Sequence, residues 1–352
     1  SIVPITRASG SRYDYNTIHA ALDTAGSGDT IQVAAGTYRE QVEIDGLDDI
    51  TLVGAGAGAT IIEMVDSPAF VNETNTSRDR AAVVSVENAS NVTIRDIGVD
   101  GRGLGEAMPS GTRPDIEGIF FGNASGAIED VTVSGTRDSL NTDGTPKGNQ
   151  RGNAIVVLDD DGAARTVDIT NTTIFDFQKT GIIVAGAGLT VNVVGNDVDG
   201  AGFLPAPNAI AQNGIQISGG AGGVVANNTI SEIGYQRGDW ITTGILAFDA
   251  ADGLEITGNT LEGVVDGAGE PIPSTHAGIY VIGETDDAVV TGNTLDGVLW
   301  GVIAASNVDN PDTSGNIYVD MIDEVATNTG NGTFTGYNLA IFGDDNDMPL
   351  AF

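Results

Sequence analysis

Short apolar runs, each opened by Gly or Ala and then Ile or Val, recur along the chain between stretches rich in Gly, Asn and Asp. They read GIFFG from 118, AIVVL from 154, GIIVA from 181, GIQIS from 214, GILAF from 244, GIYVI from 278 and GVIAA from 301. Short β-branched runs bounded by turn-forming residues predict strands and tight turns rather than helices. The pattern therefore indicates an all-β chain.

A second apolar run follows several of these strands and ends in a segment that contains Asn. The segments are VVANNTI, LEITGNTL and AVVTGNTL, with VNVVGNDV as a looser copy. Their residues Asn196, Asn228, Asn259 and Asn293 are 32, 31 and 34 positions apart. A unit of two or three short strands cannot bury its apolar face alone, so repeats of this length predict a solenoid whose stacked coils share one core.

The recurring asparagines are expected to stack. Parallel coils place equivalent residues about 4.8 Å apart, which brings Asn228, Asn259 and Asn293 within reach of neighbouring coils. We therefore expect an internal amide ladder in which each side chain bonds to the turn of the next coil. This interpretation gives the three residues a structural role.

The N-terminal part of the chain differs from the repeats. The segment YNTIHAALDTAGSGDTIQVAAGTYREQVEI predicts a short amphipathic helix over about 15–25, followed by a turn and strands. Such a helix would cover the open end of the solenoid, whose strand edge otherwise invites aggregation. We expect a single domain over 1–352, with an N-terminal cap at 1–30, coils at 31–310 and a C-terminal cap at 311–352.

The opening TIHAAL, followed by GDTIQVAAGTYREQVEI, resembles that of right-handed parallel β-helix proteins of the pectin-lyase-like superfamily, and most closely the start of pectin methylesterases. The later coils resemble the β-helix repeats of many secreted carbohydrate-active proteins. The resemblance implies a right-handed parallel β-helix and a carbohydrate-active role. Past about residue 60 no segment matches the catalytic aspartate and arginine segments of the methylesterases, so the resemblance does not extend to esterase activity.

The charge of the chain narrows its partners. With 14 Lys plus Arg against 49 Asp plus Glu, the formal net charge is −35, and such a surface repels nucleic acid and anionic membranes. No apolar run approaches the ~20 residues of a membrane span. Cysteine is absent, which excludes disulfides and thiolate chemistry. We expect a secreted or cell-surface protein suited to a salty medium or to calcium; the sequence does not define its oligomeric state.

The connections between the Asn-containing strand and the next Gly-Ile strand vary in length, and in a solenoid such insertions emerge along one wall. We place them at about 100–117, 136–153, 175–180, 199–213, 231–243 and 262–277. They hold seven of the eight Lys and Arg residues after residue 99, namely Arg102, Arg113, Arg137, Lys147, Arg151, Lys179 and Arg237. Acidic residues show no such concentration. The wall is therefore predicted to attract a carboxylate that the rest of the surface repels.

We expect a polysaccharide lyase or C5-epimerase that acts on an acidic, uronic-acid polysaccharide. Such chemistry requires a neutralised carboxylate and a base that removes the neighbouring C5 proton. The candidate catalytic residues are Lys147, Arg151, Lys179, Arg237, His276 and Tyr235, and the candidate substrate-binding residues are Trp240, Trp300, Asp239 and Arg137. Because Lys179, Thr242 and His276 precede a Gly strand start at the same offset, stacked coils are expected to align them in one column.

Two other classes of function remain open. Glycoside hydrolysis needs two carboxyl groups about 5–9 Å apart, and the acids that could supply them are Asp143, Asp159, Asp160, Asp176, Asp239 and Asp249. A non-catalytic glycan-binding or surface β-helix needs no such pair. Calcium takes several oxygen ligands, and the residues expected to bind it, if it is a cofactor, are Asp143 and Asp176.

Overall fold

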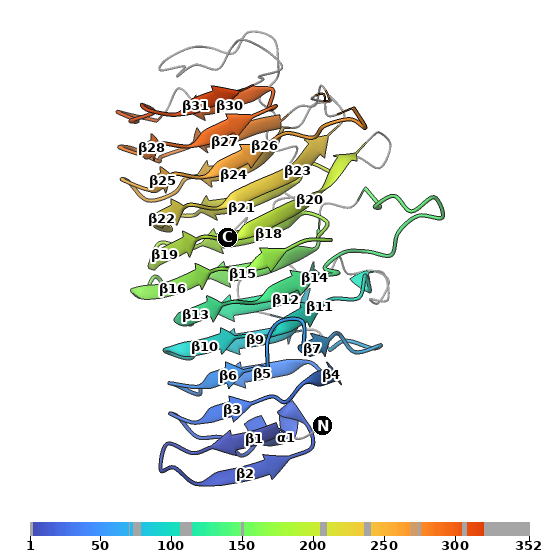
Figure 1. Cartoon of the computed structure of the whole chain (residues 1–352). Helices are drawn as coiled ribbons and strands as arrows, with labels where there is room; N and C mark the ends of the chain where they lie inside the picture. Colours follow the sequence, from blue (N-terminus) through green and yellow to red (C-terminus); the bar gives the residue numbers. More distant parts are fainter. Residues whose placement is uncertain are drawn as a thin grey trace.

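The computed structural model describes residues 3–69, 71–72, 79–105, 115–148, 151–204, 210–235, 241–268, 270, 272, 276–304 and 308–319. In this part of the chain, three elongated sheets run along one stack of coils, which rises from the N-terminal end toward the C-terminal end (Figure 1). Successive coils pair in parallel. The predicted all-β, parallel β-helix is confirmed.

We name the three sheets A, B and C. Sheet A contains, in spatial order, β2 (Arg12–Tyr15), β1 (Val3–Thr6), β3 (Thr30–Gln32), β6 (Thr51–Val53), β10 (Val92–Arg95), β13 (Gly126–Glu129), β16 (Arg165–Thr170), β19 (Leu189–Val194), β22 (Gly222–Ala226), β25 (Glu255–Thr257) and β28 (Val289–Thr291). Sheet B contains β4 (Gly36–Arg39), β7 (Thr60–Glu63), β11 (Gly98–Asp100), β14 (Thr132–Ser134), β17 (Thr173–Ile174), β20 (Asp197–Leu204), β23 (Thr229–Tyr235), β26 (Thr260–Glu262), β29 (Thr294–Asp296) and β31 (Ile317–Val319).

Sheet C completes each coil. It contains β5 (Val42–Asp45), β9 (Asp79–Glu87), β12 (Asp115–Gly122), β15 (Asn153–Leu158), β18 (Thr180–Ala185), β21 (Asn213–Ser218), β24 (Thr242–Phe248), β27 (His276–Ile282) and β30 (Trp300–Ala304), and β8 (Val71–Asn72) pairs with β9. Each coil passes through sheets A, B and C in turn. Since successive side chains of a strand point to opposite faces, alternate apolar residues such as Val193, Ile230 and Ile245 meet in one continuous core.

Packing explains the Gly that opens most strands of sheet C. At Gly244 and Gly278, a β-carbon would lie 2.3 Å from a leucine δ-carbon of sheet B, that of Leu261 and Leu295 respectively. Atoms cannot approach so closely, so a larger residue would force the leucines to move. The recurring Gly-Ile pattern therefore marks the corner between sheets B and C.

The predicted asparagine ladder is confirmed, and it extends beyond the three expected residues. Asn228 Nδ2 donates to Asn259 Oδ1, and Asn259 Nδ2 donates to Asn293 Oδ1, each over 2.9 Å. The same two oxygens also accept the backbone N–H of the preceding asparagine. Asn196 and Asn316 continue the ladder at its two ends. The ladder lies at the turn from sheet A to sheet B and satisfies backbone groups that a buried turn would leave unpaired.

The N-terminal end departs from the prediction. Helix α1 (Ile18–Leu22) is shorter than the expected 15–25, and Thr17 caps it by accepting the N–H of Ala20. The preceding residues form β2, which pairs antiparallel with β1 at the first edge of sheet A. A capping role for α1 is not confirmed. The proposed boundaries of the two caps stay predictions, and most of 311–352 lies outside the described residues.

The insertions lie near the positions that the repeats predict, but β20 and β23 extend to Leu204 and Tyr235, into the segments expected at 199–213 and 231–243. The connections that lead from a strand of sheet B to the next strand of sheet C fall at 101–114, 135–152, 175–179, 205–212, 236–241 and 263–275. All of them therefore leave the same corner of the coil, along one wall. In the described part of the chain, no helix has the length and apolar character needed to cross a membrane.

Candidate functional site

Two arginines of the predicted wall are held by acids of the chain. Arg137 Nε donates to Asp176 Oδ1 over 2.5 Å, and Arg151 Nη2 lies 2.9 Å from Asp138 Oδ1. Asp138 is buried, and its backbone N–H donates to Gln178 Oε1. The charges of these arginines are therefore largely balanced within the protein, which leaves less of each charge for a bound carboxylate.

The two predicted lysines make different contacts. Lys147 Nζ donates to Ser139 Oγ over 3.1 Å. Lys179 Nζ donates to the backbone oxygen of Ala211, and burial of the amine lowers the pKa of Lys179 to about 8. An amine with that pKa is partly neutral near neutral pH, and its neutral form can accept a proton.

The predicted column of His276 is present, but it faces the core. Thr242 pairs in register with His276, and the pairing of the intervening strands places Lys179 in the same column. In the N-terminal coils this column holds Ala81 and Ile116, which are core residues. Lys179 and His276 are three strand spacings apart, or ~14 Å, which is too far for both to act on one sugar.

His276 itself is packed inside the chain. It is 1% exposed, and its two ring nitrogens have no hydrogen-bond partner among the described residues. Burial lowers the pKa of His276 to about 3, so the ring is neutral at physiological pH. We leave His276 out of the functional site because a base must reach a bound substrate.

Of the remaining predicted residues, only Trp300 has a side chain that the structure describes. Arg237, Asp239 and Trp240 lie outside the described residues, as does the side chain of Tyr235. Trp300 is 6% exposed and packs in an apolar cluster, so it offers no open face on which a sugar could stack.

The expected calcium ligands serve other contacts. Asp143 Oδ1 accepts the backbone N–H and the hydroxyl of Thr145, and Asp176 binds Arg137. Across the described ranges, no group of three or more His, Asp or Glu side chains could hold a metal ion. A calcium site at Asp143 or Asp176 stays a prediction.

A cluster that the sequence analysis did not identify lies on the outward face of sheet C, over β5, β9 and β12. Arg80 pairs in register with Asp115, and Ala82 with Glu117, so Arg80 and both acids share one face. Arg80 Nη1 lies 2.5 Å from Glu117 Oε1, and its guanidinium carbon is 5.5 Å from the centre of the Phe120 ring. The side chains of Arg80 and Glu117 are only 3% and 0% exposed.

Burial changes the acidity of this cluster. It raises the pKa of Glu117 to about 7, against the attraction of Arg80 and with the help of the negative charge of Asp115. Burial also raises the pKa of Glu87, and the nearby Glu43 and Asp45 add to that rise. The cluster therefore contains carboxyl groups that keep a proton at higher pH than exposed ones do.

A cavity of about 230 Å³ opens beside the cluster. Its polar lining consists of His19, Gln41, Glu43, Arg80, Ser85 and Glu87. Glu43 pairs in register with Ser85, two residues before Glu87. From the strand spacing and the rise per residue, the α-carbons of the two glutamates are ~8 Å apart. Side chains on such positions can hold two carboxyl groups at the separation that glycoside hydrolysis requires.

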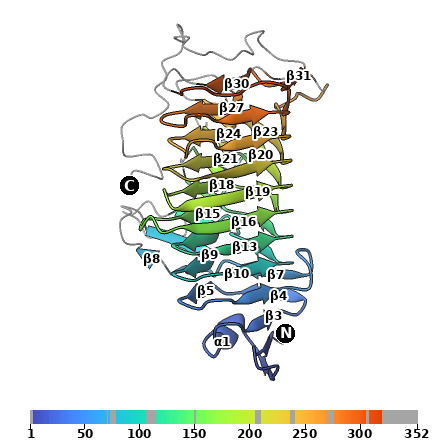
Figure 2. The same cartoon turned by 90° about the vertical axis from the view of Figure 1, so that its left-hand side faces the viewer.

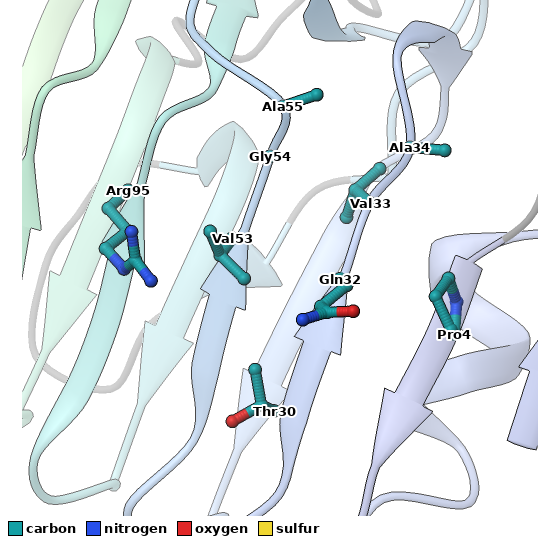
Figure 3. A pocket seen from close by; sticks show the side chains of 9 residues that line it. All are labelled: Pro4, Thr30, Gln32, Val33, Ala34, Val53, Gly54, Ala55 and Arg95. Carbon is teal, nitrogen blue, oxygen red and sulfur yellow. The ribbon is translucent and has the colours of Figure 1, made fainter. Parts of the chain in front are cut away.

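A second hollow lies on another face of the molecule. It measures about 330 Å³ and is lined by residues of sheet A and adjoining turns, among them Gln32, Val53 and Arg95 (Figure 3). Arg95 Nη1 donates to Asp96 Oδ2 over 2.7 Å. The lining, which lies entirely within the described residues, includes no carboxylate. This hollow therefore offers no pair of acids for catalysis.

The sequence contained a pattern that could have revealed part of the acid cluster. In the strand DIEGIFFG, Glu117 precedes the Gly-Ile pair, whereas the next coils carry Asn153, Thr180 and Asn213 at the equivalent position. Aligning the strand starts therefore singles out Glu117. It does not reveal Arg80, because Arg80 lies outside the predicted insertions, which begin at about residue 100.

The chain belongs to the right-handed β-helix family. The model of that family, described as a right handed beta helix region, matches residues 51–336, and the expected right-handed β-helix is confirmed. No curated protein matches the sequence.

Several solved structures resemble this fold. ORF18 of Geobacillus virus E2 is 16% identical with a TM-score of 0.49, and the match covers 87% of this chain and 58% of that one. The GH136 lacto-N-biosidase of Eubacterium ramulus is 10% identical with a TM-score of 0.43, and the match covers 87% of this chain and 63% of that one. An alginate lyase of Paenibacillus sp. str. FPU-7 is 16% identical with a TM-score of 0.44, and the match covers 90% of this chain and 97% of that one. The match spans less than two thirds of each of the first two proteins. At these identities, the likeness concerns the fold alone.

Proposed function

We propose that this chain binds a polysaccharide on the outward face of sheet C and hydrolyses a glycosidic bond at the cavity beside Arg80. Glu87 serves as the carboxylic acid, and Glu43 as the ionised carboxylate. The observation that carries this proposal is the cavity lined by both glutamates, next to the buried pair of Arg80 and Glu117.

The chemistry requires two carboxyl groups in different states. One donates a proton to the leaving oxygen, while the other, ionised, acts as nucleophile or activates water. Burial raises the pKa of Glu87, which suits it to carry the proton. Arg80 lines the same cavity. Glu117 acts as a positioning residue because it binds Arg80 from the buried side.

A neutral polysaccharide suits this cavity better than the acidic polymer expected from the sequence. Glu43 and Glu87 repel a carboxylate at close range, and Arg80 is already paired with Glu117. The strands from β5 to β21 span five strand spacings, or ~24 Å, which gives room for several sugar units. A secreted or cell-surface location is part of this proposal, because long polysaccharides lie outside the cell. Calcium has no part in it.

A lyase or C5-epimerase is the second candidate, and one observation favours it. Unlike the buried His276, Lys179 is partly exposed, and burial of its amine lowers the pKa of Lys179 to about 8, so this amine can remove a proton near neutral pH. The pairing of Arg137 with Asp176 and of Arg151 with Asp138 counts against this candidate, because a substrate carboxylate must be neutralised. We therefore rank it second.

The test is an assay of product chemistry on a panel of neutral and acidic polysaccharides. Hydrolysis produces new reducing ends without an unsaturated uronate, whereas elimination produces a product that absorbs in the ultraviolet. We expect reducing ends only. Replacing either glutamate in turn, Glu87→Gln or Glu43→Gln, should lower turnover by about 10²–10⁴, and the pH profile of Glu87→Gln should lose its fall at high pH.

The matched control is Glu284→Gln, an exposed glutamate at a turn that leads away from sheet C; it should leave turnover unchanged. Unsaturated products that disappear in Lys179→Met would select the lyase instead. If no polysaccharide yields either product although the chain binds one, the protein is a glycan-binding β-helix and the catalytic proposal is wrong.

A further inference from the structure

The outward face of sheet C carries a buried apolar cluster at its C-terminal end. Leu246, Tyr280 and Ile303 pair in register on β24, β27 and β30, and Trp300 packs with them. Leu246 and Tyr280 each lie between two residues of the core, so their own side chains point outward. Nevertheless, Leu246 is only 5% exposed, Tyr280 1% and Ile303 4%. A part of the molecule outside the sheet must cover them.

The named elements of the described chain do not provide this cover. Strands β24, β27 and β30 pack mainly against their neighbours in sheet C and against β23 of sheet B. Figure 2 labels β24, β27 and β30 of sheet C at this end of the stack, together with β23 and β31 of sheet B. The described chain ends with β31, in the last coil and at the same end of the molecule (Figure 1). The cover is therefore to be sought in residues that follow or interrupt these strands.

We propose that the C-terminal segment 320–352 docks across this cluster and covers it. The described chain ends at β31, in the last coil, and the 33 residues that follow can extend ~100 Å, whereas the cluster spans two strand spacings, or ~10 Å. Its apolar residues can replace water on the cluster: Met321, Ile322, Val325, Phe334, Tyr337, Leu339, Ile341 and Phe342. Apolar surface of this kind is stabilised when it is removed from water.

The docked segment has a defined relation to the proposed hydrolase site, although this inference does not depend on that function. The cluster that it is proposed to cover lies over β24, β27 and β30. The cavity beside Arg80 lies near β9, about five strand spacings or ~24 Å away. A polysaccharide on this face is therefore confined to the N-terminal part of sheet C.

Thiol accessibility in the full chain tests the inference, because the protein has no cysteine of its own. A single cysteine at Leu246→Cys should react slowly with a maleimide. Adding Phe334→Asp, Tyr337→Asp and Ile341→Asp should speed the reaction by roughly tenfold or more, since opening of the cover limits the rate. The control set Thr327→Asp, Asn331→Asp and Thr335→Asp adds the same charge and should change the rate little. Equal rates in the two sets would overturn the proposal.

A cysteine at the exposed Val265 gives the intrinsic rate of labelling and should react alike in every variant, and thermal melting verifies that each variant folds. A photo-crosslinking amino acid at position 280, in an otherwise unchanged chain, provides a second measurement that does not depend on the aspartate sets. Crosslinks to 320–352 of the same chain, in a mixture of isotope-labelled and unlabelled protein, support the proposal. Crosslinks to another segment or between two chains contradict it.

Discussion

Arg80 and Glu117 meet within the protein, and neither side chain is appreciably exposed to solvent. Loss of water disfavours the ionised form of each, whereas their mutual attraction favours both. For Glu117 the loss of water prevails, since its pKa rises to about 7. This single residue therefore titrates near neutral pH, unlike a carboxylate in a surface ion pair, and that behaviour can be measured without any substrate.

Glu117 should make the protein less stable as the pH rises toward neutrality. Its pKa is about 7 in the folded chain against an ordinary value of 4.5, so the folded state retains a proton that the unfolded state loses. The free energy of unfolding should therefore fall by up to ~1.4 kcal/mol per pH unit between those two values and level off above them. In Glu117→Gln this contribution is absent. The measurement is the difference between wild-type and variant unfolding free energies from pH 5 to pH 8.

Glu284→Gln is the control for general charge effects, because Glu284 is exposed. Its difference from the wild type should change little over the same pH range. If the difference for Glu117→Gln is equally flat, Glu117 remains ionised in the folded protein, and its pairing with Arg80 outweighs burial.

Strands and turns follow from the sequence repeats because every coil makes the same contacts. Gly244 fits a corner and Asn259 a ladder that recur in neighbouring coils, so one pattern reveals both features. Contacts between irregular side chains have no such repeat. Arg80 and Glu117 are 37 residues apart in the sequence, and whether they meet depends on the register and facing of two particular strands. The fold could therefore be predicted, whereas most of the candidate site could not.

The corner between sheets B and C also explains why His276 faces the core and not the predicted wall. Counting back from the core residue Ile279 in strict alternation puts His276 on the outward face. However, Gly278 faces the core as well, since its β-carbon would meet Leu295. Two successive inward positions shift the alternation by one residue and turn His276 inward. The register could be predicted from the repeats, but the facing could not, because a recurring glycine marks a position in the repeat without showing which way that position faces.

The asparagine ladder should contribute measurably to stability. Asn259→Ala removes the acceptor of the Asn228 backbone N–H and the donor to the Val225 oxygen, and both groups are buried. Each unsatisfied group costs ~1–3 kcal/mol, so the variant should lose about 2–6 kcal/mol of unfolding free energy in denaturant titrations. Asn316→Ala, at the less buried end of the ladder, should cost less. Thr229→Ala, at the exposed position that follows Asn228, should have almost no effect. Equal losses of unfolding free energy in all three variants would show that the ladder makes no specific contribution to stability.

In the molecule as a whole, the stacking of coils places equivalent charged residues next to one another, as it does the residues of the core. A net charge of −35 is distributed over coils only ~4.8 Å apart, so equivalent acids lie close together. At the turns from sheet C to sheet A, Asp252 Oδ1 accepts the N–H of Asp286, and Asp286 Oδ1 accepts that of Asp309. The backbone contacts hold the three carboxylates in a row, where they repel one another.

Salt should therefore stabilise the protein, and this row of aspartates should account for a measurable part of the effect. Two charges ~5 Å apart in water repel by about 0.8 kcal/mol, and the screening length falls from ~10 Å at 0.1 M salt to ~3 Å at 1 M. Replacing Asp252, Asp286 and Asp309 by Asn keeps each accepting oxygen and removes the repulsion. The triple variant should melt at a higher temperature than the wild type in low salt and gain less from added sodium chloride. Removing three charges elsewhere, with Glu255→Gln, Glu270→Gln and Glu284→Gln, should reduce the gain less; if both triple variants respond to salt alike, the effect arises from net charge and not from the stacking of the coils.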